Sequence, residues 1–126
     1  MKVDIRPRKR NAPRIAEKSA PQFLQWLRGR SCFVATHGLG SCICEAGKIE
    51  AAHVDYAGGK GVGTKASDRH AIPLCGFHHR TQHTAGWRSF ECKYFGEIGV
   101  AEIAAEQFWK AWPGRIAWER KLEDAK

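Results

Sequence analysis

Two histidines at a helical spacing could hold a metal ion. Five of the six histidines lie between positions 53 and 83, and His79 and His83 in that group are four residues apart. On a helix this spacing places both side chains on one face, with Cβ atoms about 5–6 Å apart, so both imidazoles can bind one ion at about 2.0–2.1 Å. The alternative is a pair of exposed polar residues with no ligand.

A group of cysteines accompanies these histidines. Cys75 and His78 form a Cys-x-x-His turn, whose two side chains can share one zinc tetrahedron. Candidates for the other two ligands are Cys32, Cys42 and Cys44. Only one residue separates Cys42 from Cys44, which makes it hard for both thiolates to bind the same ion with good geometry. Buried cysteines without a metal are the alternative interpretation.

Composition and hydropathy indicate the class of protein and its compartment. With 126 residues, 43% hydrophobic and 27% charged, the chain has the composition of one globular domain. The basic N-terminal residues lack the apolar stretch typical of a signal peptide, and no apolar run approaches the roughly 20 residues of a membrane-spanning helix. We therefore expect a cytoplasmic protein with no membrane partner, in which the thiols are reduced. The odd number of cysteines also favours metal binding over disulfides. Cys92 lies in a segment that should pack, and we expect it to be buried.

Positive charge is concentrated at the N-terminus. Of the net charge of +8, residues 1–30 carry nine Lys and Arg against two acidic residues, and residues 31–126 carry twelve against eleven. A basic arm on a nearly neutral body favours a polyanion such as DNA, because each neutralised phosphate releases counterions. A solvated tail that only aids solubility is the main alternative, followed by a membrane surface or an acidic protein as partner.

Two short strands should position His53. Residues 49–56 and 71–74 have strand-like patterns, and Pro73 in the second is compatible only with an edge or irregular position. Residues 31–47, rich in Gly and Cys, are expected to be irregular. The two strands suggest a ribbon with His53 toward the end of its first strand.

The loop between the strands is dense in glycine. Four glycines lie between positions 58 and 63, which makes this connection too flexible for a regular element. They would let the backbone approach a phosphate that Lys65 neutralises, with Lys60 close by in the chain. Alternatively, the loop needs its glycines only to turn sharply.

Helices are expected to enclose this ribbon, because apolar residues recur at helical spacing between proline and glycine signals. The expected ranges are 21–28, 76–85, 87–95, 100–112 and 116–122. The apolar stripe of the fourth range consists of Ile103, Ala104, Phe108 and Ala111. The aromatic residues Phe108, Trp109 and Trp112 are expected in the core rather than as a platform for stacked bases.

The order of these residues resembles phage and prophage HNH (ββα-metal) endonucleases, in particular the small proteins related to the RecA-dependent nuclease Ref. The residues that carry the resemblance are EAAH at 50–53, GVGTKASD at 61–68, IPLCGFHH at 72–79 and His83. The resemblance extends over about residues 22–112. It implies an α+β fold, with a small zinc-stapled ββα-metal core and flanking helices over residues 21–126. Residues 1–20 contain two prolines, many charges and almost no apolar periodicity, and are expected to form a flexible basic arm.

The resemblance also implies catalytic roles. His53 corresponds to the general base that activates water, a role that suits an imidazole with a pKa near 6.5. His79 and His83 correspond to ligands that hold one divalent ion, Mg²⁺ or another, against the phosphate and the leaving oxygen.

For the structural zinc, the resemblance pairs Cys75 and His78 as the second half of the site. It favours Cys32 and Cys44 for the first half, with Cys42 as an extra or substitute ligand. The implied cofactors are therefore one structural Zn²⁺ and one catalytic divalent ion.

The middle asparagine of the HNH pattern is absent. Asp68 stands where related phage proteins often carry aspartate, so the resemblance assigns it the role of orienting the imidazole of His53. His70 lies close in the sequence and could replace it. Asp68 could also be a turn residue that bonds its own backbone, or a metal ligand.

These residues predict metal-dependent hydrolysis of DNA, in phage or prophage recombination or DNA processing. A RecA-type recombinase filament is a candidate partner by the same resemblance. The residues expected to contact nucleic acid are Lys60, Lys65, Arg6, Arg8, Lys9 and Arg10. The alternatives are a non-catalytic, zinc-dependent DNA-binding or recombination accessory protein, and a nuclease that acts on RNA.

Overall fold

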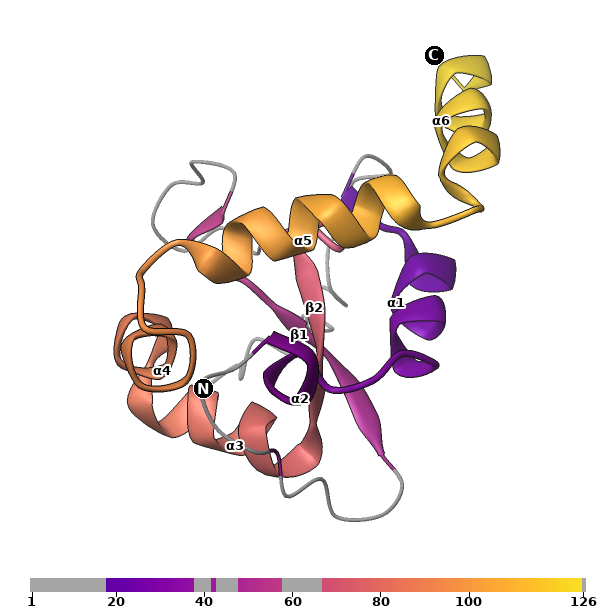
Figure 1. Ribbon diagram of the computed structural model, residues 1–126. Coiled ribbons are helices and arrows are strands. Elements are labelled where there is room, and N and C mark those ends of the chain that lie inside the picture. Colours follow the sequence, from indigo (N-terminus) through magenta and orange to yellow (C-terminus); the bar gives the residue numbers. More distant parts are fainter. Residues whose placement is uncertain (1–17, 38–41, 43–47, 58–66, 126) are drawn as a thin grey trace, which may run out of the picture.

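A two-stranded antiparallel sheet lies among helices in the computed structural model, which describes residues 18–37, 42, 48–57 and 67–125 (Figure 1). In chain order the elements are α1 (Pro21–Arg28), α2 (Phe33–His37), β1 (Ile49–His53), β2 (Ala71–Cys75), α3 (Gly76–Ala85), α4 (Trp87–Tyr94), α5 (Val100–Ala111) and α6 (Arg115–Asp124). The chain is therefore α+β, as the sequence predicted. No helix in these ranges is long and apolar enough to cross a membrane.

The pairing of the two strands fixes which side chains share a face. His53 lies opposite Ala71, and Glu50 lies opposite Leu74. Successive side chains of a strand point to opposite faces, so Glu50 and His53, three residues apart, project from opposite faces of the sheet. This separation governs how the candidate functional residues can combine.

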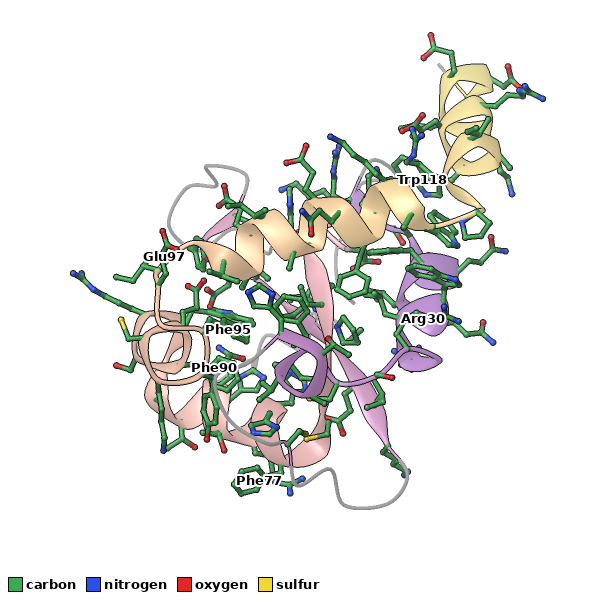
Figure 2. All side chains as sticks on the ribbon, in the orientation of Figure 1. Arg30, Phe77, Phe90, Phe95, Glu97 and Trp118 are labelled. Carbon is green, nitrogen blue, oxygen red and sulfur yellow. The ribbon has the colours of Figure 1, made fainter. Side chains whose placement is uncertain are left out.

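Two hydrophobic cores meet at the sheet. One core contains Ala52, Ile72 and Leu74 of the strands and packs them against α2, α4 and α5. Phe90 and Phe95 belong to this core and lie inside the fold next to α4 (Figure 2). The other core contains Ala71 and packs it against α1 and the C-terminal part of α5.

Local sequence signals set the ends of the helices that carry candidate ligands. The side chain of Cys75 caps α3 by accepting a hydrogen bond from the backbone N–H of His78, with N and Sγ 3.5 Å apart. Gly86, with φ of 84°, separates α3 from α4, and Gly99, with φ of 97°, precedes α5. Both positions need the left-handed region of backbone conformation that glycine adopts at little cost.

Several expectations about these elements are wrong in detail. α2 forms within the segment expected to be irregular, and β1 ends at His53 rather than at residue 56. Ile103 is 62% exposed, although it was assigned to the apolar stripe. Cys92 is exposed as well, because α4 turns Trp87, Phe90 and Glu91 inward instead. The buried face of α5 consists of Ala101, Ala104, Ala105 and Trp109.

The last three residues of the expected arm, 18–20, contact the body of the domain. Ala20 is 2% exposed and donates its backbone N–H to Oδ2 of Asp68 at 2.8 Å. The backbone N–H of Asp68 donates in turn to the carbonyl oxygen of Lys18 at 3.0 Å. The indole of Trp118, in α6, donates to the carbonyl oxygen of Ser19 at 3.0 Å. Residues 18–20 therefore belong to the packed domain, and residues 1–17 lie outside the described part of the chain.

Candidate metal centres

Three cysteines and one histidine gather where α2, β2 and α3 begin or end. The ligand atoms of Cys32, Cys42, Cys75 and His78 all lie within 4.8 Å of one another. Nδ1 of His78 is 3.1 Å from Sγ of Cys75, 3.3 Å from Sγ of Cys42 and 3.7 Å from Sγ of Cys32. A zinc tetrahedron with bonds of about 2.0–2.3 Å needs ligand atoms roughly 3.3–3.8 Å apart. The donor set and its dimensions are consistent with zinc.

Burial gives these groups the properties of a structural site. Burial raises the pKa of the Cys75 thiol, although hydrogen bonds from the backbone of His78 and Phe77 oppose this shift. Burial lowers the pKa of His78, so its imidazole stays neutral near pH 7 and can offer a lone pair to a metal. A zinc ion would compensate the buried thiolates, which are costly without a counter-charge.

Among the described residues, the fourth member of the cluster is Cys42, the extra or substitute ligand of the resemblance. Cys44 lies outside the described residues, whereas Sγ of Cys42 is in the cluster, 3.8 Å from Sγ of Cys75. Cys42 is disulfide-bonded in this structure, so its sulfur can bind zinc only after reduction. Cys42 was the substitute ligand in the sequence analysis, and here it completes a Cys₃His set.

His79 and His83, which the sequence predicted as ligands of a catalytic ion, lie together on the next turn of α3. Nδ1 of His79 donates to Oε1 of Glu50 at 2.7 Å, and Nε2 of His79 is 3.1 Å from Nε2 of His83. Two nitrogens that each bind one ion at about 2.0–2.1 Å are separated by roughly 3–3.5 Å. The Glu50 carboxylate on the far nitrogen is the usual partner of a metal-binding imidazole, because it fixes the tautomer and the ring orientation.

His53 and Asp68 form a separate pair. Nε2 of His53 lies 2.9 Å from Oδ1 of Asp68, and the histidine side chain is 39% exposed. Asp68 is 4% exposed, and its other oxygen accepts the N–H of Ala20. A buried carboxylate held by a backbone amide can keep the imidazole in one tautomer, with Nδ1 left for another partner.

Asp68 is the residue that contacts His53, and His70 lies nearby in the chain. Its ring is half-buried, and burial lowers the pKa of His70. Arg69 lowers this pKa further, while Glu102 and Glu106 of α5 oppose the shift. His70 therefore interacts electrostatically with two acidic residues of α5, Glu102 and Glu106. Asp68, by contrast, contacts His53.

The two histidine groups do not touch each other within the described residues. Glu50 brings His79 to one face of β1, and His53 projects from the other face toward Asp68 and Ala20. The sequence predicted His53 and the pair on α3 as parts of one active site.

Three residues with notable contacts or burial had no role predicted from the sequence. Glu50 was part of the resemblance, but its contact with His79 spans 29 positions of the sequence. Trp87 donates its indole N–H to the carbonyl oxygen of His53 at 3.1 Å, and Glu91 is fully buried. The alternation of side chains along β1 is the signal that could have placed Glu50 on the face of α3.

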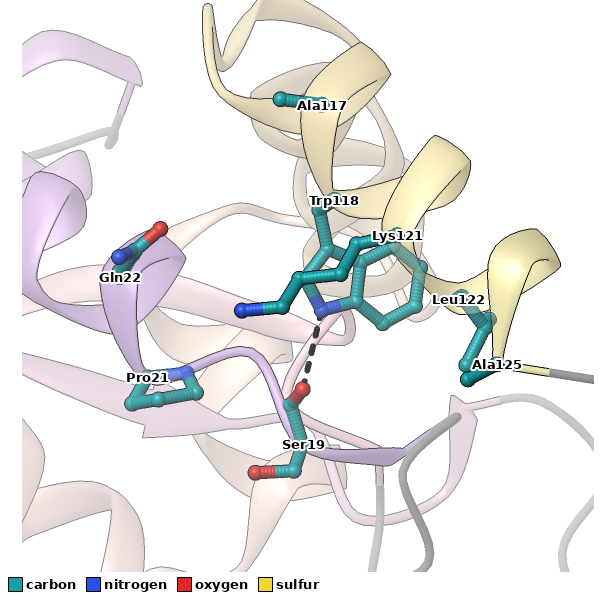
Figure 3. Close-up of a pocket in the computed structure, with 8 residues that line it drawn as sticks. All are labelled: Ser19, Pro21, Gln22, Ala117, Trp118, Lys121, Leu122 and Ala125. Carbon is teal, nitrogen blue, oxygen red and sulfur yellow. Dashed lines mark hydrogen bonds between the residues drawn. The ribbon is translucent and has the colours of Figure 1, made fainter.

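The lysines and arginines expected to contact nucleic acid all lie outside the described ranges. They are Lys60, Lys65, Arg6, Arg8, Lys9 and Arg10. A cavity of about 520 Å³ lies between α1 and α6, where Trp118 donates to Ser19 (Figure 3). Its lining contains none of the candidate ligands, so we assign it no part in either centre.

Comparisons of the chain with models of protein families, with curated protein sequences and with solved structures found no match. Any functional conclusion therefore depends on the residues and on the geometry described above.

Proposed function

We propose that this protein is an endonuclease of the HNH (ββα-metal) class, with a structural zinc ion and a catalytic divalent ion. The observation that carries the proposal is the arrangement of Glu50, His79 and His83. It offers two imidazole nitrogens to one ion and leaves the remaining positions open, as a catalytic centre requires. The DNA phosphodiester bond is the proposed substrate.

In this proposal, the side chains would have the following roles in the reaction. The Nδ1 nitrogen of His53 takes a proton from the attacking water, and Asp68 holds the ring through Nε2 and stabilises the imidazolium that forms. His79 and His83 hold the divalent ion, which when bound stabilises charge on the phosphate and the leaving oxygen. Cys32, Cys42, Cys75 and His78 would fix the start of α3, and with it the two metal-binding histidines, through the structural zinc.

The basic N-terminal arm supports DNA as the substrate. Residues 1–17 contain six Lys and Arg against two acidic residues, and such a segment binds phosphates without regard to base sequence. A role in phage or prophage recombination, with a RecA-type filament as partner, follows from the resemblance alone and is part of the same proposal.

A second candidate function is a zinc-stabilised DNA-binding or recombination accessory protein without catalysis. The observation in its favour is that Glu50 and His53 project from opposite faces of β1, which separates the proposed base from the proposed metal ligands. This alternative needs the Cys₃His cluster and the basic arm, but neither His53 nor His83.

Cleavage of supercoiled plasmid separates the two candidates. Reduced, zinc-loaded protein would be incubated with plasmid and Mg²⁺, Mn²⁺, Ni²⁺ or EDTA, beside the His53→Ala variant. A nuclease cuts with a divalent ion, stops in EDTA and is disabled by His53→Ala while DNA binding persists. Binding without cleavage under every condition would favour the accessory protein. Equal cutting by His53→Ala would remove His53 from the mechanism.

A further inference from the structure

Two side chains of α4 form hydrogen bonds with the segment that begins at His53. Nε1 of Trp87 donates to the carbonyl oxygen of His53 at 3.1 Å. One turn later, Oε2 of Glu91 accepts a hydrogen bond from the hydroxyl of Tyr56 at 2.9 Å. Trp87 and Glu91 are four residues apart, so they lie on one face of the helix. The rings of Tyr56 and Trp87 also meet edge to face, with centroids 6.5 Å apart.

Glu91 joins this segment to a third element. Its Oε2 also accepts the backbone N–H groups of Gly99 and Ala101, each at 2.9 Å. These amides lie at the start of α5, where N–H groups lack helical partners and negative charge is favourable. One buried carboxylate therefore ties the chain after β1 to α4 and to the N-terminus of α5.

Capping α5 does not by itself account for this network, because burying a carboxylate costs free energy. Glu91 is fully buried, and its Oε1 has no hydrogen-bond partner among the described residues. Burial, and after it the hydrogen bond and charge of Glu91, raises the pKa of Tyr56 well above its ordinary value, so its hydroxyl remains a donor. The N-cap of α5 is Gly99, which has no side chain to bond these amides, so Glu91 caps the helix instead. Glu91 also bonds Tyr56, which capping α5 does not require.

We propose that Trp87, Glu91 and Tyr56 are positioning residues that hold the backbone of His53 so that its imidazole meets Asp68. The catalytic consequence rests on the proposed nuclease function, whereas the coupling to the His53 ring does not. An error of about 1 Å in the placement of a catalytic group can cost roughly a hundredfold in rate. These residues therefore matter for the reaction although they do not touch the substrate.

Two tryptophans provide a matched pair of variants for the test. Trp87→Phe removes the indole donor to His53, and Trp26→Phe makes the same substitution in α1, where the indole packs against Phe23 and Phe108. Tyr56→Phe removes a single hydroxyl from a partly exposed residue and keeps the test possible if Trp87→Phe does not fold. Two measurements are made on each zinc-loaded variant, the ring ¹H–¹⁵N spectrum of His53 and the single-turnover rate of plasmid cleavage.

We expect Trp87→Phe and Tyr56→Phe to shift the ring signals of His53 and to slow cleavage roughly tenfold to a hundredfold, with DNA affinity unchanged. Trp26→Phe should change neither measurement. Shifted ring signals in a protein that does not cut any plasmid would support the positioning role and overturn the nuclease proposal. Ring signals that match the wild type in both Trp87→Phe and Tyr56→Phe would overturn the positioning role, whatever the activity.

Discussion

His79 donates its Nδ1 hydrogen to Oε1 of Glu50 at 2.7 Å and thereby turns its Nε2 toward Nε2 of His83, 3.1 Å away. A strand residue thus sets the orientation of a helix residue that lies 29 positions later in the chain. The proposed ion-binding geometry depends on the packing of α3 against β1, because neither element alone holds both groups.

Removing the charge of Glu50 should weaken divalent-ion binding at this centre. In Glu50→Gln, a neutral amide replaces the carboxylate on His79, and loss of such a partner typically costs about 10–100-fold in metal affinity. Calorimetric titration of Mn²⁺ into zinc-loaded protein measures the effect. Glu106→Gln is the control, because Glu106 pairs with Lys110 on the exposed surface of α5 at 3.2 Å. Equal Mn²⁺ affinity in both variants would count against the centre.

The Cys₃His cluster should hold about one tightly bound zinc ion per reduced chain. Cys75→Ser and His78→Ala should lose this zinc, and chelation should lower the melting temperature, because structural zinc binding contributes directly to folding. Cys92→Ser, at an exposed cysteine of α4, should keep both properties. Metal analysis and thermal melts in a reducing buffer provide the measurements. A zinc-free protein with an unchanged melting curve would refute the site.

The identity of the fourth ligand can be tested separately. Sγ of Cys42 is 3.3 Å from Nδ1 of His78, so we expect Cys42→Ser to reduce zinc affinity and Cys44→Ser to leave it nearly unchanged. Competition with a chromogenic chelator measures both affinities after reduction. The reverse result would restore Cys44 as the ligand that the resemblance favoured.

Much of the fold follows from the sequence, because its signals are local. The proline at the start of α1, the glycines around α3 and α4, and the helical periodicity of residues 100–111 set the ends of these elements to within a few residues. α2 was missed because its five residues form too short a helix for periodicity to show. Ile103 was misplaced because the small side chains of Ala101 and Ala105, rather than the larger isoleucine, let α5 approach the core.

The candidate site was predictable in its residue types but not in its contacts. The spacing of His79 and His83 fixes their common face, and Cys75 and His78 form a local turn. By contrast, the contacts of Asp68 with Ala20 and of Glu91 with Tyr56 span 48 and 35 positions. Such pairs depend on how the helices pack, for which the sequence has no periodic signal.

The stability of the protein should depend on pH through His70. Burial lowers the pKa of His70 below its ordinary value of 6.5. The unfolded chain therefore takes up this proton first as the pH falls. The contribution of His70 to stability is fully present above about pH 6.5 and is lost as the pH falls through the lower pKa of the folded state. His70→Gln removes this dependence.

Melting temperatures of the wild type and of His70→Gln at about pH 7.5 and about pH 5 measure that contribution. The wild type should lose more stability than the variant on acidification. Zinc content is measured at both pH values, because His78 and the thiolates respond to pH in each protein. A constant difference in melting temperature between the two proteins at both pH values would contradict the prediction.

The basic arm and the packed body can be separated by two deletions. Deleting residues 1–17 removes six Lys and Arg but none of the residues that hold Asp68. We expect the shortened protein to fold and to bind DNA more weakly, with a slope of log affinity against log salt that is shallower by about 0.9 for each lost phosphate contact. Deleting residues 1–20 removes the Ala20 amide as well and should lower the melting temperature. An unchanged salt slope after the shorter deletion would exclude the arm from DNA binding.

The most direct test of the account is the dependence of plasmid cleavage on Mn²⁺ concentration in His83→Ala. Thr84→Ala, next to it on the exposed side of α3, is the control. The account predicts that His83→Ala needs far more Mn²⁺ for half-maximal cleavage, or does not cut, while its zinc content and DNA affinity match the wild type. Cleavage by His83→Ala with the Mn²⁺ dependence of the wild type would contradict the assignment of His79 and His83 as ligands of the catalytic ion.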